Sequence, residues 1–241
     1  SSSGSNAGKI NIDANSFQLE NAAINSTTGK DSTGNGGEIN INLAGSFALN
    51  NSNINANSSG TGNAGTISIT AKNVEMEKGI IQSNTDNSGK SGNISINATD
   101  SFRVVGAGIT ANSSSTGDAG TVSITAKNVQ LEGGGGIESI ASASGKSGNI
   151  FINATDSFGL TDGRITANSS GTGNAGTISI DAKNVQIERG GINSIASNSG
   201  KSGNIFINAT DSFGLINVGI QANSSGTGDA GTITIDAKNG Q

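Results

Sequence analysis

The sequence predicts an all-β protein: a right-handed parallel β-helix, or β-solenoid, that forms a single repeat segment over residues 1–241. Three observations support this prediction. A glycine returns about once every 28 residues, isoleucines alternate with polar residues after each glycine, and no 3.6-residue period appears among the Gly, Ser, Asn and Thr residues that disfavour helices. The repeating glycines are Gly8, Gly37, Gly65, Gly92, Gly120, Gly148, Gly176, Gly203 and Gly231.

The composition alone would be typical of a disordered chain. Apolar residues make up 32% of the sequence, which is low against about 45–50% in average proteins. However, the isoleucines fall in the same phase in every repeat, and a disordered linker has no physical reason to keep them there. Because stacked repeats share one continuous core, the chain is read as one elongated body rather than as a number of globular domains.

Each repeat contains three short extended stretches. In the first stretch, Ile67, Ile69 and Ala71 occupy alternate positions, so their side chains share one face. The second stretch carries a pair of larger apolar residues, such as Val129 and Leu131. The third stretch begins at an isoleucine that precedes the next glycine at a fixed distance: Ile54, Ile81, Ile109, Ile137, Ile165, Ile192 and Ile220.

These stretches predict three short strands per coil of about 28 residues and eight to nine coils in total. Stacked at about 4.8 Å per coil, eight intervals give a rod of roughly 38 Å, and right-handed winding is the rule for parallel crossovers. Equivalent residues lie above one another, so Val129 is expected between Phe102 and Phe158. The apolar pair is displaced by one residue between two alternating repeat types. The full repeat is therefore a pair of coils, as the return of segment 145–160 at 200–215 illustrates.

The position two residues before each glycine predicts a ladder of charges between coils. Lysine never occupies this position in neighbouring coils, where like charges would repel each other. Aspartate or asparagine stands between the lysines instead. The charged members of the ladder are Lys90, Asp118, Lys146, Lys201 and Asp229.

Two periodic apolar pairs are expected on the outside of the coils. Phe151 and Phe206 stand where other coils carry Ser, Asn or Thr between two inward isoleucines. Ile140 and Ile195 replace an outward asparagine after the third stretch. The two members of each pair are separated by one full repeat, so each pair recurs in every second coil. Because exposed apolar patches tend to mark contact surfaces, these residues are candidates for a lateral contact surface between rods.

The residue inventory argues against most site chemistry. The chain lacks His, Cys, Tyr, Trp and Pro, and the GKSG segments do not fit the phosphate-loop pattern. No catalytic residue, cofactor site or metal site is expected, although single aspartates and frequent Asn-x-Ser/Thr segments leave calcium binding and glycosylation open. With a net charge of −5 and no basic patch, nucleic acid is not an expected partner, and no apolar run is long enough to span a membrane.

Two other functions are compatible with a β-solenoid. Outward threonine columns resemble an ice-binding face, although Phe151 and Phe206 interrupt them. A polysaccharide-active enzyme would need a cleft with clustered acids and basic residues. The loops are expected to be short and uniform, and Arg103 and Arg164 are expected to be isolated.

The repeated segments NAGTISI (63–69 and 174–180), AKNV and SGNIFINATDSF together resemble secreted two-partner-secretion proteins of the filamentous-haemagglutinin-like class, in particular their cyanobacterial members. The resemblance covers essentially the whole chain. It implies an extracellular right-handed β-helix that serves as a fibre or adhesin stalk at the cell surface, and an outer-membrane export partner.

The chain opens within a repeat, and the secretion domain of that class has no counterpart in it. We therefore expect an interior segment of a longer fibrous protein. Both ends are expected to be open strand edges, which favour self-association end to end. Lateral association and a host or cell-surface ligand are the other expected partners.

Overall fold

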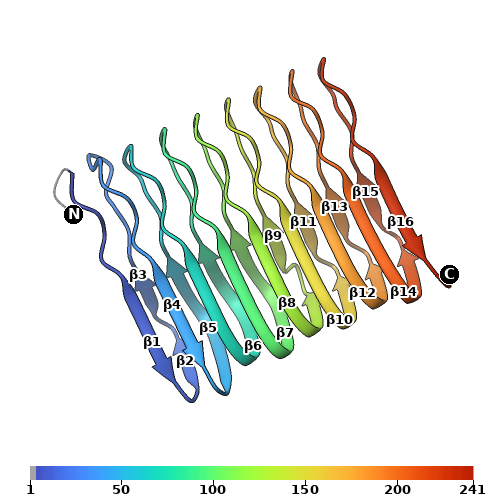
Figure 1. Cartoon of the computed structure of the whole chain (residues 1–241), viewed down its shortest axis with the longest axis horizontal. Helices are drawn as coiled ribbons and strands as arrows, with labels where there is room; N and C mark the ends of the chain where they lie inside the picture. The colour runs from blue at the N-terminus through green and yellow to red at the C-terminus, as the bar shows by residue number, and fades with distance from the viewer. Residues whose placement is uncertain (1–3, 241) are drawn as a thin grey trace.

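The computed structural model describes residues 4–240 as one stack of parallel β-strands (Figure 1). The strands are β1 (Ile10–Ala14), β2 (Phe17–Glu20), β3 (Ala23–Asn25), β4 (Ile39–Leu43), β5 (Ser46–Asn55), β6 (Ile67–Gln82), β7 (Ile94–Thr110), β8 (Val122–Glu132), β9 (Gly136–Glu138), β10 (Ile150–Thr161), β11 (Arg164–Thr166), β12 (Ile178–Glu188), β13 (Gly191–Asn193), β14 (Ile205–Ile216), β15 (Gly219–Gln221) and β16 (Ile233–Ala237).

The strand register follows the glycine period of the sequence. Ile10 pairs with Ile39 and Ile39 pairs with Ile67, so paired residues keep the spacing of the repeating glycines. At the other end of the stack, Ile205 pairs with Ile233. The predicted parallel β-solenoid is therefore confirmed.

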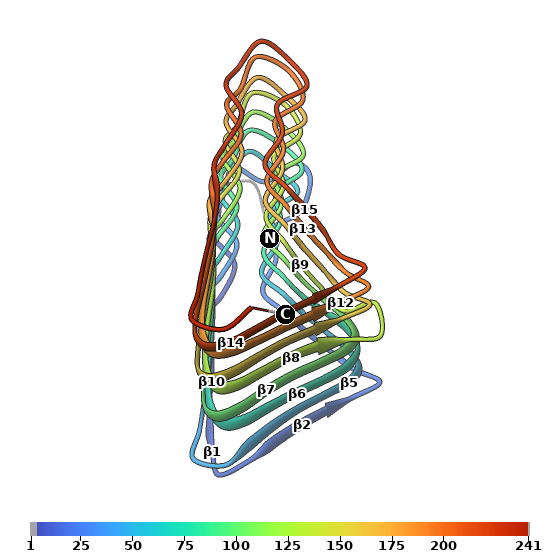
Figure 2. The ribbon, with the colours of Figure 1, turned by 90° about the vertical axis from the view of Figure 1, so that its right-hand side faces the viewer.

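The coils wind in the right-handed sense. In Figure 1 the chain runs down the front and returns up the back as it advances from the N-terminus to the C-terminus. Figure 2 shows the cross-section, which has three walls and a narrow arm. In the coil that begins at Gly148, we call residues 150–154 the first wall, 157–161 the second wall, 164–166 the third wall and 167–176 the arm, and we use the same names for equivalent residues of other coils.

The core consists of columns of identical or similar aliphatic side chains. Val129 pairs with Phe102 on one side and Phe158 on the other, as the sequence predicts. Burying each large aliphatic side chain contributes about 1.5–3 kcal/mol. The first-wall isoleucines of three successive coils, which are equivalent to Ile67 and Ile69, are at most 1% exposed: Ile150, Ile152, Ile178, Ile180, Ile205 and Ile207.

The first and second walls are not separate strands in most coils, which differs from the three short strands expected. β10 runs through both walls, and β6 and β7 continue into the third wall. The register between β10 and β12 shifts after Asn153, and pairing resumes at Ser157 with Asn184. A bulge of this kind accommodates the extra residue of one coil type, so pairing continues around the corner.

The arm replaces what the sequence suggests are simple turns. Two backbone runs face each other across it, joined by hydrogen bonds such as Gly176 N–H to the Ala167 carbonyl (2.9 Å). A Cβ on Gly176, one of the repeating glycines, would lie 1.9 Å from the carbonyl oxygen of Gly148 in the previous coil, and a Cβ on Gly173 would lie equally close to that of Gly145. Because no side chain fits there, this close approach gives the glycine period its physical cause.

The corner between the second and third walls uses left-handed backbone. The φ angles are 44° at Asn51, 52° at Lys78, 53° at Asp162 and 47° at Arg189. This conformation costs residues with a side chain roughly 1–2 kcal/mol. Sequence reasoning missed this corner because Lys78, Asp162 and Arg189 occupy it in the middle coils, and asparagine, which favours this conformation, occupies it only towards the two ends, at Asn21, Asn51 and Asn217.

Each end of the described stack presents a strand with one partner only. β1 pairs with β4, and β16 pairs with β14. Ile233 and Ile235 on β16 are 41% and 39% exposed. Self-association through these edges stays a prediction. Within residues 4–240, we find no helix with the length and hydrophobicity needed to cross a membrane.

Candidate functional surfaces

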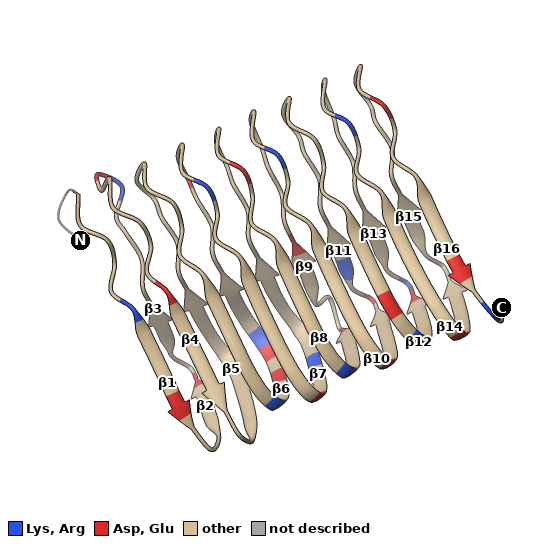
Figure 3. Ribbon diagram, in the orientation of Figure 1, with Lys and Arg blue, Asp and Glu red and all other residues tan. Residues whose placement is uncertain are grey.

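The predicted charge ladder lies on the arm, where an acidic or an uncharged residue separates each lysine from the next along the rod (Figure 3). The Lys90 ammonium lies 3.1 Å from Asp118 Oδ2, and the Lys201 ammonium lies 2.7 Å from Asp229 Oδ2. Lys146 contributes its backbone N–H, which donates to Asp118 Oδ1 at 2.9 Å. The ion pairs are exposed, so each contributes little to stability. The hydrogen bond from the Lys146 backbone N–H, unlike the ion pairs, requires an oxygen acceptor in a fixed position on residue 118.

The Asp118 carboxylate is an acceptor built into the ladder. The hydrogen bond from the Lys146 backbone N–H, and after it the Lys90 ammonium, hold the pKa of Asp118 below its usual value, although partial burial opposes this shift. A carboxylate with a lowered pKa stabilises the fold above its unfolded pKa of about 3.9. This contribution is lost as the pH falls through the lower folded value.

We expect Asp118→Ala to lower the free energy of unfolding by about 1 kcal/mol at pH 7, because the Lys146 N–H loses its acceptor. The matched control is Asp118→Asn. At the equivalent position the amide oxygen of Asn63 already accepts the Lys90 N–H at 2.8 Å, so asparagine should cost less than alanine. Urea denaturation of both variants measures the difference. Equal losses would mean that the charge, rather than the hydrogen bond, matters.

Hydrogen bonds explain why the repeat is a pair of coils. In one coil type, Ser139 Oγ accepts from the Gly148 N–H at 2.9 Å and donates to the Gly120 carbonyl of the previous coil at 2.7 Å. In the other type, Ala167 has no hydroxyl, and its carbonyl accepts the Gly176 N–H instead. Each serine thus bridges two coils.

Other columns show the same complementarity. Ser157 Oγ donates to Asn128 Oδ1 at 2.8 Å, where the TDSF and AKNV segments meet. Immediately before the first wall, the Thr121 N–H donates to Asn93 Oδ1 and the Thr177 N–H to the Oδ1 of Asn149, both at 2.8 Å. Threonine and asparagine therefore alternate from coil to coil. The outward threonines do not form the uninterrupted array that an ice-binding face would present.

Phe151 and Phe206 project outward from the first wall. Phe151 on β10 is 41% exposed, and Phe206 on β14 is 38% exposed. Ser179 on β12 pairs with both, so the two rings stand two coils apart, about 9.6 Å along the rod. We call these two residues the Phe row.

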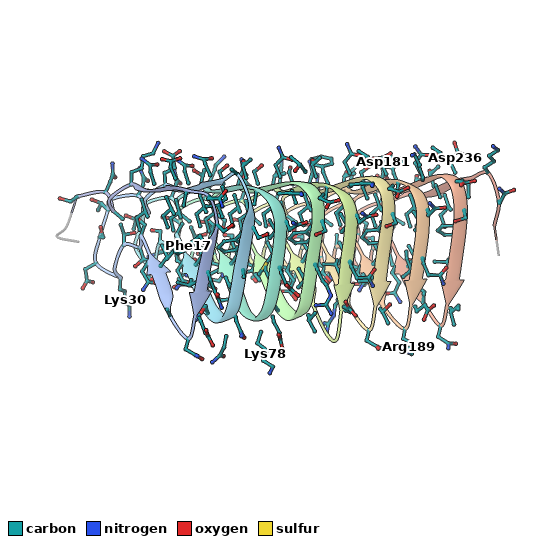
Figure 4. All side chains as sticks on the ribbon, turned by 90° about the horizontal axis from the view of Figure 1, so that it is seen from below. Phe17, Lys30, Lys78, Asp181, Arg189 and Asp236 are labelled. Atoms are coloured by element: carbon teal, nitrogen blue, oxygen red, sulfur yellow. The ribbon has the colours of Figure 1, made fainter. Side chains whose placement is uncertain are left out.

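The Phe row and the corner between the second and third walls face different directions. Asp181 and Asp236, which belong to the same wall as the Phe row, project from one side of the rod in Figure 4, whereas Lys78 and Arg189 at the corner project from the opposite side. A partner bound to the Phe row therefore leaves the corner accessible.

Ile140 and Ile195 are half-buried and lie at the base of the arm, after the third wall. The Ile140 N–H donates to Asn112 Oδ1 and the Ile195 N–H donates to Asn168 Oδ1, both at 2.8 Å. The isoleucines thus interrupt a column of asparagines, in which each isoleucine follows an asparagine of the previous coil. They do not share the first wall with the Phe row, so the two apolar pairs form separate surfaces.

The expectation that Arg103 is isolated was wrong. Its guanidinium lies 2.9 Å from Glu75 in the previous coil and 2.8 Å from Glu132 in the next coil. The Arg103 side chain is long enough to reach both neighbouring coils. The sequence does not reveal this contact, because about 28 residues separate Arg103 from each glutamate.

At the corner, Arg189 donates two hydrogen bonds to Asp162, at 2.9 and 3.0 Å, which hold the pKa of Asp162 below its usual value.

A polar recess of about 410 Å³ lies beside this corner, on the third wall. Arg164 lies in the recess, and among residues 4–240 it forms no ion pair, unlike Arg103 and Arg189. Sequence reasoning missed the recess because glycines from three coils form it. Its lining is Gly134, Gly136, Glu138, Asp162, Gly163, Arg164, Arg189, Gly190, Gly191 and Asn193.

The part of the chain that the structure describes contains no cluster of three or more residues suited to hold a metal ion. No protein-family model matches this chain, and neither a curated protein nor a solved structure shows significant similarity to it.

Proposed function

We propose that this chain is a segment of an extracellular structural or adhesive fibre at the cell surface, and that it acts by its shape rather than as an enzyme. In this proposal the parent protein is a filamentous-haemagglutinin-like protein that an outer-membrane partner exports. Support comes from the uniform stack, because coils of one shape convert sequence length directly into reach.

The observation that carries the proposal is the Phe row. Phe151 and Phe206 are each more than one-third exposed. In the coil between them, the polar residue Ser179 occupies the same position. Scattered apolar surface residues are ordinary, but a row repeated in register along a rod gives a second rod the same spacing to match. Two copies can therefore pack side by side through the Phe row and bundle laterally.

The double variant Phe151→Ser with Phe206→Ser tests this proposal. We expect its far-ultraviolet circular dichroism and melting temperature to match those of the wild type, because serine occupies the same column in neighbouring coils. Lateral bundles seen by electron microscopy should become fewer and thinner. Unaltered bundles in a folded double variant would refute the Phe row as the contact.

The matched control also changes two outward residues of the first wall. Ser123→Ala with Ser179→Ala alters the same column without removing a ring, and bundling should not change. The opposite change, Ser179→Phe, makes the row continuous over three coils and should increase bundling.

Ice binding and polysaccharide cleavage are the alternatives. Outward threonines such as Thr70 on the first wall are the feature that ice binding would use, although asparagines separate them from coil to coil, and measurable thermal hysteresis would support that function in place of a fibre. Release of reducing ends from a polysaccharide would support an enzyme.

A further inference from the structure

The third wall has glycines that the fold does not require. A Cβ on Gly136 would come no closer than 3.5 Å to another atom, and the same holds for Gly191, whose nearest neighbour would be Asn193 Nδ2. Both are ordinary van der Waals distances, whereas Gly173 in the arm would collide at 1.9 Å. The glycines of the third wall therefore leave open space rather than permit a close backbone approach.

Arg164 stands in the middle of this open space. On β11 it pairs in register with Gly136 of β9 and Gly191 of β13, so neither neighbouring coil places a side chain beside it. The two acidic residues of the lining are already engaged in part: Asp162 accepts two hydrogen bonds from Arg189, and Glu138 accepts one from Asn112 at 3.4 Å. The Arg164 guanidinium keeps its donors for a ligand.

The lining defines the chemistry of that ligand. A guanidinium fits a carboxylate with two parallel hydrogen bonds. Glu138 and Asn193 occupy the next outward positions on β9 and β13 and supply oxygen acceptors and an amide donor, which suit hydroxyl groups. None of the lining residues is aromatic or a large aliphatic. A sugar acid is a ligand that combines one carboxylate with several hydroxyl groups.

We propose that this recess binds a sugar acid, with its carboxylate on Arg164 and its hydroxyls on Glu138 and Asn193. The inference deepens the proposed adhesive role, because a sugar acid is a ligand that a surface fibre can hold. It does not depend on the Phe row, which faces another side of the rod. Failure of sugar binding and failure of bundling are therefore separate results.

The experiment is isothermal titration of the intact chain with D-glucuronate and D-glucose, which differ only by the carboxylate at C6. We expect glucuronate to bind and glucose not to bind. Oligomers of β-1,4-linked glucuronate, compared with cello-oligosaccharides, distinguish a free sugar acid from an acidic polysaccharide as the source, since tighter binding of the oligomer than of the monomer would indicate the polysaccharide. Absence of heat from both the monomer and the oligomer of glucuronate would overturn the proposal.

Variants assign the binding to the recess. Arg164→Ala should weaken glucuronate binding by about tenfold or more, because a charge-assisted pair is lost. Gly191→Val should weaken it by filling the recess while keeping the arginine. The matched control, Arg103→Ala, removes the same charge elsewhere and should leave the affinity unchanged. Equal weakening by Arg164→Ala and Arg103→Ala, or none by Arg164→Ala, would overturn the assignment.

Discussion

Replacing Ile178 by aspartate is expected to unfold the coils around it. Ile178 is 0% exposed and pairs with Ile150 and Ile205 in the adjacent coils. A carboxylate there would lose its hydration without gaining a hydrogen bond or a counter-ion, and an uncompensated buried charge costs about 3–5 kcal/mol. Because each coil contacts only its neighbours, the damage should centre on three coils.

Circular dichroism and thermal melting measure this effect, with Ser179→Asp as the matched control. Ser179 is the next residue and points outward, and Asp181 already stands two positions further along the same wall. The control should melt close to the wild type. An Ile178→Asp variant with an unchanged spectrum and melting curve would show that the core register is wrong.

The second large effect is expected from Gly173→Ala in the arm. The added Cβ would lie 1.9 Å from the Gly145 carbonyl oxygen and 2.4 Å from its carbonyl carbon. Hydrogen bonds between the coils hold both backbone runs on either side of this contact, from the Thr172 N–H to the Ala143 carbonyl and from the Ser147 N–H to the Asn174 carbonyl, both at 2.9 Å. We expect a loss of about 3 kcal/mol, the upper part of the usual range for overpacking, measured by urea denaturation.

Gly136→Ala is the matched control for this change. Its Cβ would meet nothing closer than 3.5 Å, and its backbone φ lies outside the left-handed region. Alanine there should be neutral or should stabilise the fold by about 0.4–1 kcal/mol through the unfolded state. Similar losses at Gly173 and Gly136 would contradict the role assigned to the arm.

The stacking order of the fold could be predicted because it depends on periodicity alone. The columns of Ile, and Val129 between Phe102 and Phe158, follow from aligning the repeats. The arm could not be predicted in the same way, since a Gly- and Ser-rich segment fits a turn as well as two closely packed backbone runs. The left-handed corner also gives little signal, because Lys78 and Arg189 are unusual residues for that conformation.

The candidate sites also differ in how far the sequence predicts them. The outward direction of Phe151 and Phe206 follows from strand alternation. The recess around Arg164 depends on Gly136 and Gly191 in the two adjacent coils, and on the engagement of Asp162 by Arg189. These relations are visible only when coils are placed next to one another, and the same proximity overturned the expectation for Arg103.

The pairing of unlike coils restricts how such a rod can change its length in evolution. Recombination between tandem gene repeats adds or deletes whole units. A gain or loss of one complete pair of coils leaves every coil beside one of the other type, with each serine bridge and asparagine acceptor still matched. Loss of the single coil that carries Asn174, by contrast, would place the lysine-bearing arms of Lys146 and Lys201 in contact. Changes in the length of the rod are therefore expected to add or remove coils two at a time.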